Sequence, residues 1–99
     1  MNDSEGDQLF FKLCSDHLSF EAIPKNALKI DLSKLRDHTL RGHELVMWTP
    51  QFAILKNLQG QEITLRRDGR MVIRKVAGES SARKAASEIM NLVTSALAR

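Results

Sequence analysis

The chain has 99 residues, of which 42% are hydrophobic and 27% are charged. This length makes one domain with little left for a second, and the composition is that of an ordinary soluble globular protein. The single cysteine, Cys14, excludes an internal disulfide. No apolar run approaches the roughly 20 residues that a helix needs to span a bilayer.

The net charge of +3 divides unevenly along the chain. Residues 1–22 hold five acidic residues against one lysine, whereas residues 23–99 hold 14 Lys or Arg against 7 Asp or Glu. A basic body behind an acidic segment favours an anionic partner, or a body masked by its own tail. The N-terminal sequence MNDSEGDQ lacks the basic and apolar regions of a secretory signal, so we expect a cytoplasmic protein.

We divide the chain into an acidic N-terminal segment with a short helix, residues 1–22, and one α+β domain, residues 23–99. The helix is predicted from Asp7 onwards, because five side chains follow i, i+3, i+4 spacing. These side chains are Leu9, Phe10, Leu13, Cys14 and His17. Pro24 ends any extension of this helix.

A short half-buried strand and a weak helix are predicted next. The strand is indicated by apolar residues that alternate with polar ones, namely Leu28, Ile30 and Leu32. Asp31 or Ser33 can cap a helix over about 33–41, and Gly42 suits the position that follows its end.

Four strands are predicted between residues 44 and 76. Two compact apolar runs, 44–48 and 52–56, are separated by Thr49-Pro50-Gln51, which is a turn signal. Residues 62–67 alternate, with Ile63 and Leu65 on one face and Arg66 on the other. Asp68-Gly69 predicts a two-residue type I′ hairpin turn to a strand over 71–76.

The chain ends in a predicted amphipathic helix that begins after Gly78-Glu79-Ser80-Ser81. Its apolar stripe consists of Ala82, Ala86, Ile89, Val93 and Leu97. The order after residue 25 is therefore β-α-β-β-β-β-α, which predicts a two-layer α+β sandwich with an antiparallel sheet and both helices on one face. The other face of the sheet stays open.

The open face is expected to need a cover, because the strands over 44–48 and 52–56 are apolar on both sides. The N-terminal helix is the economical cover. A second copy of the chain or a partner protein is the alternative.

Two family resemblances fit this order of elements. About 70 residues, Pro24 to Val93, resemble the small C-terminal domain that follows the catalytic domain in some ThiF/MoeB-type (E1-like) adenylyltransferases. The matching residues are Asn26-Ala27-Leu28-Lys29-Ile30, Asp31-Leu32, Leu35, Phe52, Leu55, Glu62-Ile63-Thr64-Leu65, Asp68-Gly69-Arg70 and Ala82-Arg83. The resemblance implies a partner from the machinery that handles sulfur-carrier proteins. The nucleotide loop and paired C-x-x-C motifs of those enzymes are missing from this sequence, and Ile23 stands where the family often has a cysteine.

The segment GRMVIRKVAGESSARKAA is similar to the end of one repeat of the TATA-binding-protein fold. That protein needs two repeats, and this chain has one. Arg66 stands at the hairpin position where that protein carries a wedging phenylalanine, so the sequence does not support kinking of DNA by intercalation there.

Motifs for catalysis or metal binding are weak. Cys14-x-x-His17 lacks a second ligand pair and is interpreted as part of a buried helix stripe. His38 and His43 are interpreted as solvated turn residues, and Ser80-Ser81 as a helix cap rather than a phosphate site. No nucleophile and base stand in a recognisable order. We therefore expect no enzyme, no cofactor and no metal.

The sequence favours a non-enzymatic protein-interaction or accessory domain linked to sulfur-carrier or cofactor-biosynthesis machinery, binding a protein partner or a second copy through the open face. The predicted partner-binding residues are Val46, Trp48, Phe52, Arg66 and Arg74. The alternative is a nucleic-acid-binding domain that uses a basic sheet face. Its predicted contacts are Lys29, Arg66, Arg70 and Arg74.

Overall fold

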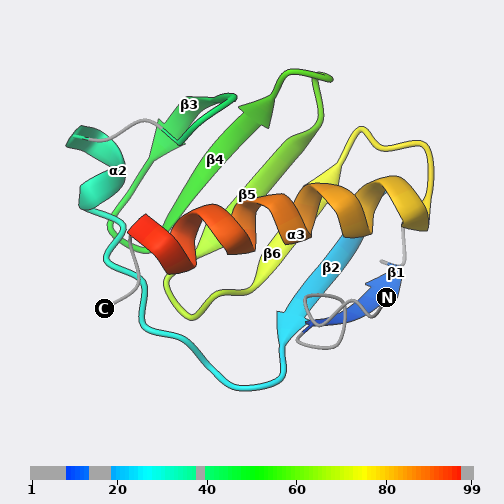
Figure 1. Ribbon diagram of the computed structural model, residues 1–99, viewed down its shortest axis with the longest axis horizontal. Helices are drawn as coiled ribbons and strands as arrows, with labels where there is room; N and C mark the ends of the chain where they lie inside the picture. The colour runs from blue at the N-terminus through cyan, green and yellow to red at the C-terminus, as the bar shows by residue number, and fades with distance from the viewer. Residues whose placement is uncertain (1–8, 14–18, 38–39, 97–99) are drawn as a thin grey trace.

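The computed structural model describes residues 9–13, 19–37 and 40–96 of the chain, with the side chains of residues 37 and 94–96 left out. Within these ranges the protein is a small α+β domain, with an antiparallel sheet and a long C-terminal helix (Figure 1). The elements are β1 (Leu9–Leu13), β2 (Ser19–Pro24), α2 (Lys34–Asp37), β3 (His43–Trp48), β4 (Phe52–Asn57), β5 (Glu62–Arg66), β6 (Met71–Arg74) and α3 (Glu79–Ala96).

The sheet has six strands in the order β1-β2-β6-β5-β4-β3. Every neighbouring pair is antiparallel. Strands β3 to β6 form a meander, and the β1–β2 hairpin joins it beside β6. Helix α3 crosses one face of the sheet, and the single turn of α2 lies beside β3 at its far end (Figure 1). The predicted α+β class, antiparallel sheet and C-terminal helix are confirmed, whereas the element order and the layer of two helices are not.

The predicted N-terminal helix is wrong, because residues 9–13 are a strand. Leu9 pairs with Pro24 and Leu13 pairs with Phe20 across the β1–β2 hairpin. Leu9 is buried at 4% exposure, whereas Phe10 is 57% exposed, which is the alternation of a strand. A short apolar run fits both periods, and pairing with a neighbouring strand decides between them. Cys14 and His17 lie outside the described residues.

The predicted strand over 28–32 is reduced to one bridge at Ile30. The N–H of Leu28 donates to the Asp68 carbonyl at 3.1 Å, and the N–H of Ile30 donates to the Arg67 carbonyl at 3.0 Å. The segment therefore pairs with the β5–β6 turn, which is too short to support a ladder. The alternation itself is real, since Ile30 and Leu32 are buried while residues 29 and 31 are exposed.

The predicted strands on either side of the β5–β6 turn are confirmed, but the two-residue type I′ turn is wrong. A type I′ turn needs a positive φ at both Asp68 and Gly69. Gly69 has a φ of +93°, but among the described residues other than glycine only Lys75 has a positive φ, so Asp68 does not. The N–H of Gly69 donates to the Arg66 carbonyl at 3.0 Å, and the N–H of Arg66 donates to the Arg70 carbonyl at 2.9 Å. The loop therefore has three residues, 67–69, and only its glycine adopts the left-handed conformation.

The predicted strands β3 and β4 are confirmed, and the Thr49 hydroxyl holds their turn. This oxygen accepts the N–H of Gln51 at 3.2 Å and that of Phe52 at 3.0 Å. The pairing register shifts between Leu45 and Met47, which marks a β-bulge. The bulge changes which β3 side chains share a face.

Helix α2, Lys34–Asp37, is shorter than the predicted span of about 33–41, and Asp31 caps it. The Asp31 carboxylate accepts hydrogen bonds from the N–H and the hydroxyl of Ser33. Gly42 follows with a φ of +73°. His38 lies outside the described residues.

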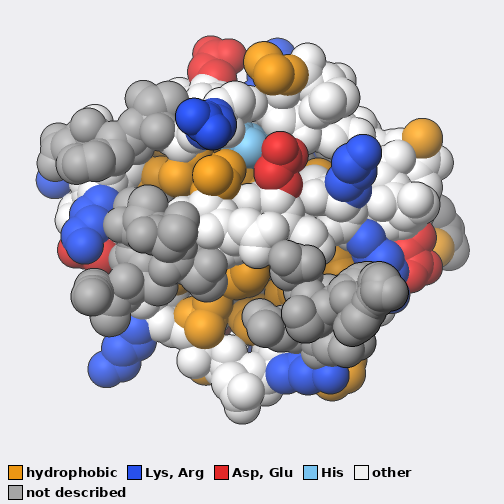
Figure 2. Space-filling model, viewed as in Figure 1, with side chains coloured by type: hydrophobic (Ala, Val, Ile, Leu, Met, Phe, Trp, Pro, Cys, Tyr) orange, Lys and Arg blue, Asp and Glu red, His pale blue; other side chains and the backbone are white. Residues whose placement is uncertain are grey.

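The core lies between α3 and the sheet. The predicted stripe is confirmed at Ala82, Ala86, Ile89 and Val93, which are all 0% exposed, while Leu97 lies outside the described residues. These small alanines let α3 approach β2 and β6, against which it packs. The Arg83 Nε–H of α3 donates a hydrogen bond to the Glu79 carboxylate at 2.8 Å, and the Arg83 guanidinium stacks 4.5 Å from the centre of the Phe11 ring on β1. On this side hydrophobic side chains show beside the helix, and Lys and Arg side chains spread around the rim (Figure 2).

Candidate interaction surface

We call the side of the sheet that faces away from α3 the open face. Strand registers place its side chains in rows that run across the strands, because residues opposite each other share a face. One row, the charged row, has one residue from each of β6, β5, β4 and β3. Its members are Arg74, Glu62, Lys56 and Glu44. Opposite charges therefore alternate along the whole row.

The neighbouring row, the apolar row, crosses the same four strands two residues away on β6, β5 and β4 and three residues away on the bulged β3. Its members are Val72, Thr64, Ile54 and Met47. The first three are partly buried, whereas Met47 at the edge is 49% exposed. Val46, in the bulge beside it, is 50% exposed, so the β3 end of the sheet carries the more exposed apolar surface of this row.

A third row begins with Arg66 and Phe52, which are register partners on β5 and β4. They line a shallow hollow of about 440 Å³ at the end of the sheet. The residues around it are Gln51, Phe52, Thr64, Arg66, Arg67 and Asp68. Two predicted partner-binding residues, Phe52 and Arg66, are thus brought together.

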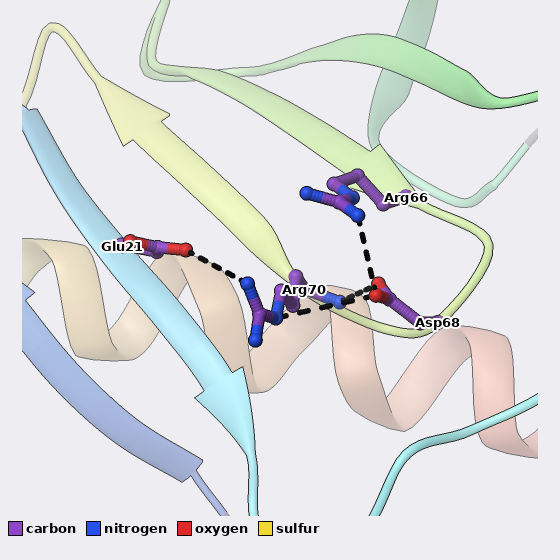
Figure 3. Close-up of polar contacts among 4 residues, drawn as sticks. All are labelled: Glu21, Arg66, Asp68 and Arg70. Atoms are coloured by element: carbon purple, nitrogen blue, oxygen red, sulfur yellow. Dashed lines mark hydrogen bonds and ion pairs between the residues drawn. The ribbon is translucent and has the colours of Figure 1, made fainter.

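Three of the four cations that the sequence singled out, Arg66, Arg70 and Arg74, are paired with acids. Arg66 lies 3.4 Å from Asp68, and Arg70 lies 4.0 Å from Asp68 and 3.8 Å from Glu21 on β2 (Figure 3). Arg70 sits between the two carboxylates, on the side of the sheet away from α3. Pairs this exposed contribute little to stability, but they compensate the positive charge of the surface.

The same compensation operates at the β6 end of the charged row. Glu62 lies 3.9 Å from Arg74 and 3.3 Å from Lys75. Residues 66–75 hold five cations, Arg66, Arg67, Arg70, Arg74 and Lys75. Four of them are paired with acids, so this segment is less basic in space than along the sequence.

Lys29 and Arg67 differ from these cations. In the described part of the chain, neither side chain has an ion pair. Both line a second hollow of about 500 Å³ on the other side of the β5–β6 turn. Of the four predicted nucleic-acid contacts, Arg66, Arg70 and Arg74 belong to the open face, and Lys29 lies beyond the turn.

Trp48 packs on the α3 side and not on the open face. Its register partner is Ala53, which is fully buried, and its indole N–H donates to the Leu32 carbonyl at 2.7 Å. The Arg36 guanidinium stacks 4.5 Å from its ring. Simple alternation puts Val46 and Trp48 on one face, and the bulge separates them.

His43 is a buried residue, which corrects its interpretation as a solvated turn residue. It is 7% exposed and pairs with Asn57 on β4. Its Nδ1 donates to the Arg41 carbonyl at 2.7 Å, and its buried Nε2 has no hydrogen-bond partner among the described residues. It forms part of the packing that ends the sheet at β3.

The remaining polar motifs have structural roles. Gly78 supplies the carbonyl that accepts the Ala82 N–H at 3.0 Å, so Ser80-Ser81 lie inside the first turn of α3 and do not cap it. The Ser33 hydroxyl, the Ser33 N–H and the charge of Lys34 lower the pKa of Asp31 below its usual value of 3.8. Over residues 9–13, 19–37 and 40–96, no cluster of three or more His, Cys, Asp or Glu could hold a metal ion.

The sequence prediction missed several residues of the open face: Met47, Ile54, Lys56, Glu44 and Glu62. Alternation within β3, β4 and β5 could have placed four of them, but Met47 lies after the bulge and depends on it. Comparison of the chain with models of known families, with curated proteins and with solved structures gave no match. None of the described helices is long and apolar enough to cross a bilayer.

Proposed function

We propose that this domain is a non-enzymatic protein-interaction domain that binds a protein partner through the open face. The supporting observation is the apolar row with Val46 beside it, of which Met47 and Val46 are about half exposed. It lies next to a charged row whose members compensate one another. Exposed apolar surface rimmed by polar residues is typical of protein interfaces.

The partner class follows from the sequence resemblance. We propose a component of sulfur-carrier or cofactor-biosynthesis machinery, since the matches at Asn26-Ala27 and Asp68-Gly69-Arg70 belong to the domain that follows E1-like catalytic domains. A cytoplasmic location is part of the same proposal. Ion pairs at Arg66, Arg70 and Arg74 reduce the positive potential that a phosphate backbone needs, which favours a protein over a nucleic acid.

An amide-shift titration by NMR tests the proposal. Adding a sulfur-carrier protein is expected to move resonances of the open face, with Met47 and Ile54 among them, and an oligonucleotide is expected to move none. Met47→Asp should abolish the shifts. Leu58→Asp is the matched control, because Leu58 is 86% exposed and lies outside β4, in the turn. Binding that is equal in both variants would contradict the open face as the site.

Nucleic-acid binding is the second candidate, favoured by Lys29 and Arg67, which line the second hollow and have no ion pair with another described residue. It requires an affinity that falls with salt by roughly one log-log step per phosphate contacted. The variant Lys29→Glu/Arg67→Glu should then abolish oligonucleotide binding. If the unmodified protein shows no salt-dependent shift at all, this candidate fails.

A further inference from the structure

Building on the proposed function, we infer that the open face binds a second copy of this chain when that partner is absent. The two copies pack face to face about a two-fold axis that runs parallel to the strands, between β4 and β5. Three features of the open face agree on this one axis: the charged row, the apolar row, and the pair Arg66 and Phe52.

The charged row is complementary to its own reversal. From β6 to β3 its signs are plus, minus, plus, minus, carried by Arg74, Glu62, Lys56 and Glu44. A two-fold axis between β5 and β4 reverses this order in the second copy. Arg74 then faces Glu44 of the second copy, and Glu62 faces its Lys56. Because the contact is isologous, each pair occurs twice.

The same axis reverses the apolar row. Met47 then lies over Val72 of the second copy, and Ile54 lies over its Thr64. The half-exposed edge of one sheet is thereby buried on the inner strand β6 of the other. Apolar side chains meet apolar or small neutral ones, and no charge is buried in this row.

The third row adds a contact between unlike groups. Reversal sets Arg66 over the Phe52 ring of the second copy, an arrangement in which a guanidinium and an aromatic face attract. In one copy these residues are register partners, and Arg66 is exposed. In one copy the guanidinium pairs with Asp68 at 3.4 Å, and in the dimer the ring of the second copy would replace or add to this exposed contact.

The overlap in such a dimer consists of β6, β5, β4 and β3 of each copy, while β1 and β2 lie beyond it. At about 4.8 Å per strand the overlap is roughly 19 Å wide, which is less than the 32 and 26 Å of the two longest dimensions of the molecule (Figure 1). The buried area therefore lies at the low end of interface sizes. Two sheets packed with aligned strands lie about 10 Å apart, which lets both layers of side chains interdigitate.

Charge reversal provides the test. In Lys56→Glu two glutamates face each other across the axis, and in Glu62→Lys two lysines do. Sedimentation velocity should give twice the chain mass for the unmodified protein and a dimer weakened about tenfold or more for each variant. An equimolar mixture of the two variants should form a dimer again, as should the double variant Lys56→Glu/Glu62→Lys.

A monomeric unmodified protein, single variants that dimerise normally, or a mixture that stays monomeric would each overturn the inference. Circular dichroism checks that each variant folds. If a charge variant does not fold, Met47→Asp replaces it, since residue 47 is half exposed in one copy. It should be monomeric while Leu58→Asp dimerises, and a dimeric Met47→Asp would also overturn the inference.

The NMR titration separates this inference from the proposed function. A monomer whose open face still shifts on addition of a sulfur-carrier protein would end the homodimer and leave the interaction domain standing. A monomer whose open-face resonances do not move when a sulfur-carrier protein is added would end both the homodimer and the proposed interaction domain.

Discussion

On the α3 side of β5, Ile63 and Leu65 are completely buried, whereas on the other side of the same strand Thr64 is partly buried and Arg66 is exposed. The contrast extends across the sheet. The α3 side is closed by small and aliphatic side chains, and the open face combines half-exposed apolar groups with paired charges. The alternate residues that face α3 therefore stabilise the fold, while those on the open face are available for binding.

The largest expected effect comes from a substitution on the α3 side. Leu65→Ala should lower the free energy of unfolding by about 2–5 kcal/mol, because it leaves a cavity in a fully buried site. Thr64→Ala, one residue away on the open face, should change it by about 1 kcal/mol or less. Urea unfolding followed by circular dichroism measures both, and equal losses would contradict the division of the sheet into two faces.

A second prediction concerns the turn that joins β5 to β6 at the end of the sheet. Gly69→Ala should cost roughly 2–4 kcal/mol, because the φ is +93° and the new Cβ would lie 2.9 Å from Leu28 Cδ1. Gly60→Ala is the matched control, since its φ is +82° but no atom lies within 4 Å of the new Cβ. It should cost only the backbone strain, about 1–2 kcal/mol. Equal losses would show that Leu28 does not pack against Gly69.

A third prediction separates stability from association. Met47→Asp should change the unfolding free energy of the monomer by only about 0.5 kcal/mol, because the side chain is half exposed. The melting temperature of the unmodified protein should rise with its concentration, since dimerisation stabilises the folded state. Met47→Asp should remove this dependence. A concentration dependence that persists in this variant would place the interface elsewhere.

The smallest expected effect is at the cap of α2, away from both faces. Hydrogen bonds from Ser33 lower the pKa of Asp31, so the stabilisation by its ionised form is complete above the usual value of 3.8 and is lost as pH falls through the lowered pKa. The unfolding free energies of the unmodified protein and Asp31→Asn should therefore differ most near neutral pH and converge in acid. A constant difference across this range would contradict the role of the charge.

The sequence could predict the β3–β6 meander and α3, because turn residues and period-two alternation agree along residues 43–76. It could not decide residues 9–13, where four apolar residues and Lys12 fit a helix and a strand equally well. Pairing with β2 supplies the deciding contacts, and β2 in turn depends on β6, which is distant in the sequence. Non-local contacts of this kind leave no local pattern.

The candidate site was predictable only in part. Alternation within β5 and β6 correctly put Arg66 and Arg74 on the open face. It failed for Trp48, because the bulge at Leu45–Met47 shifts the register of β3. The charged row could not be recognised before the registers of β3, β4, β5 and β6 were known, since its four residues lie on four strands.

One measurement tests the face-to-face dimer most directly. Val72 and Met47 lie on β6 and β3, three strand spacings or about 14 Å apart in one copy, too far for a nuclear Overhauser effect. In a sample that mixes isotope-labelled with unlabelled chains, a filtered NOE experiment should show contacts between the methyl groups of Met47 and Val72 from different copies. Contacts between copies that involve only the α3 side, or none at all, would contradict it.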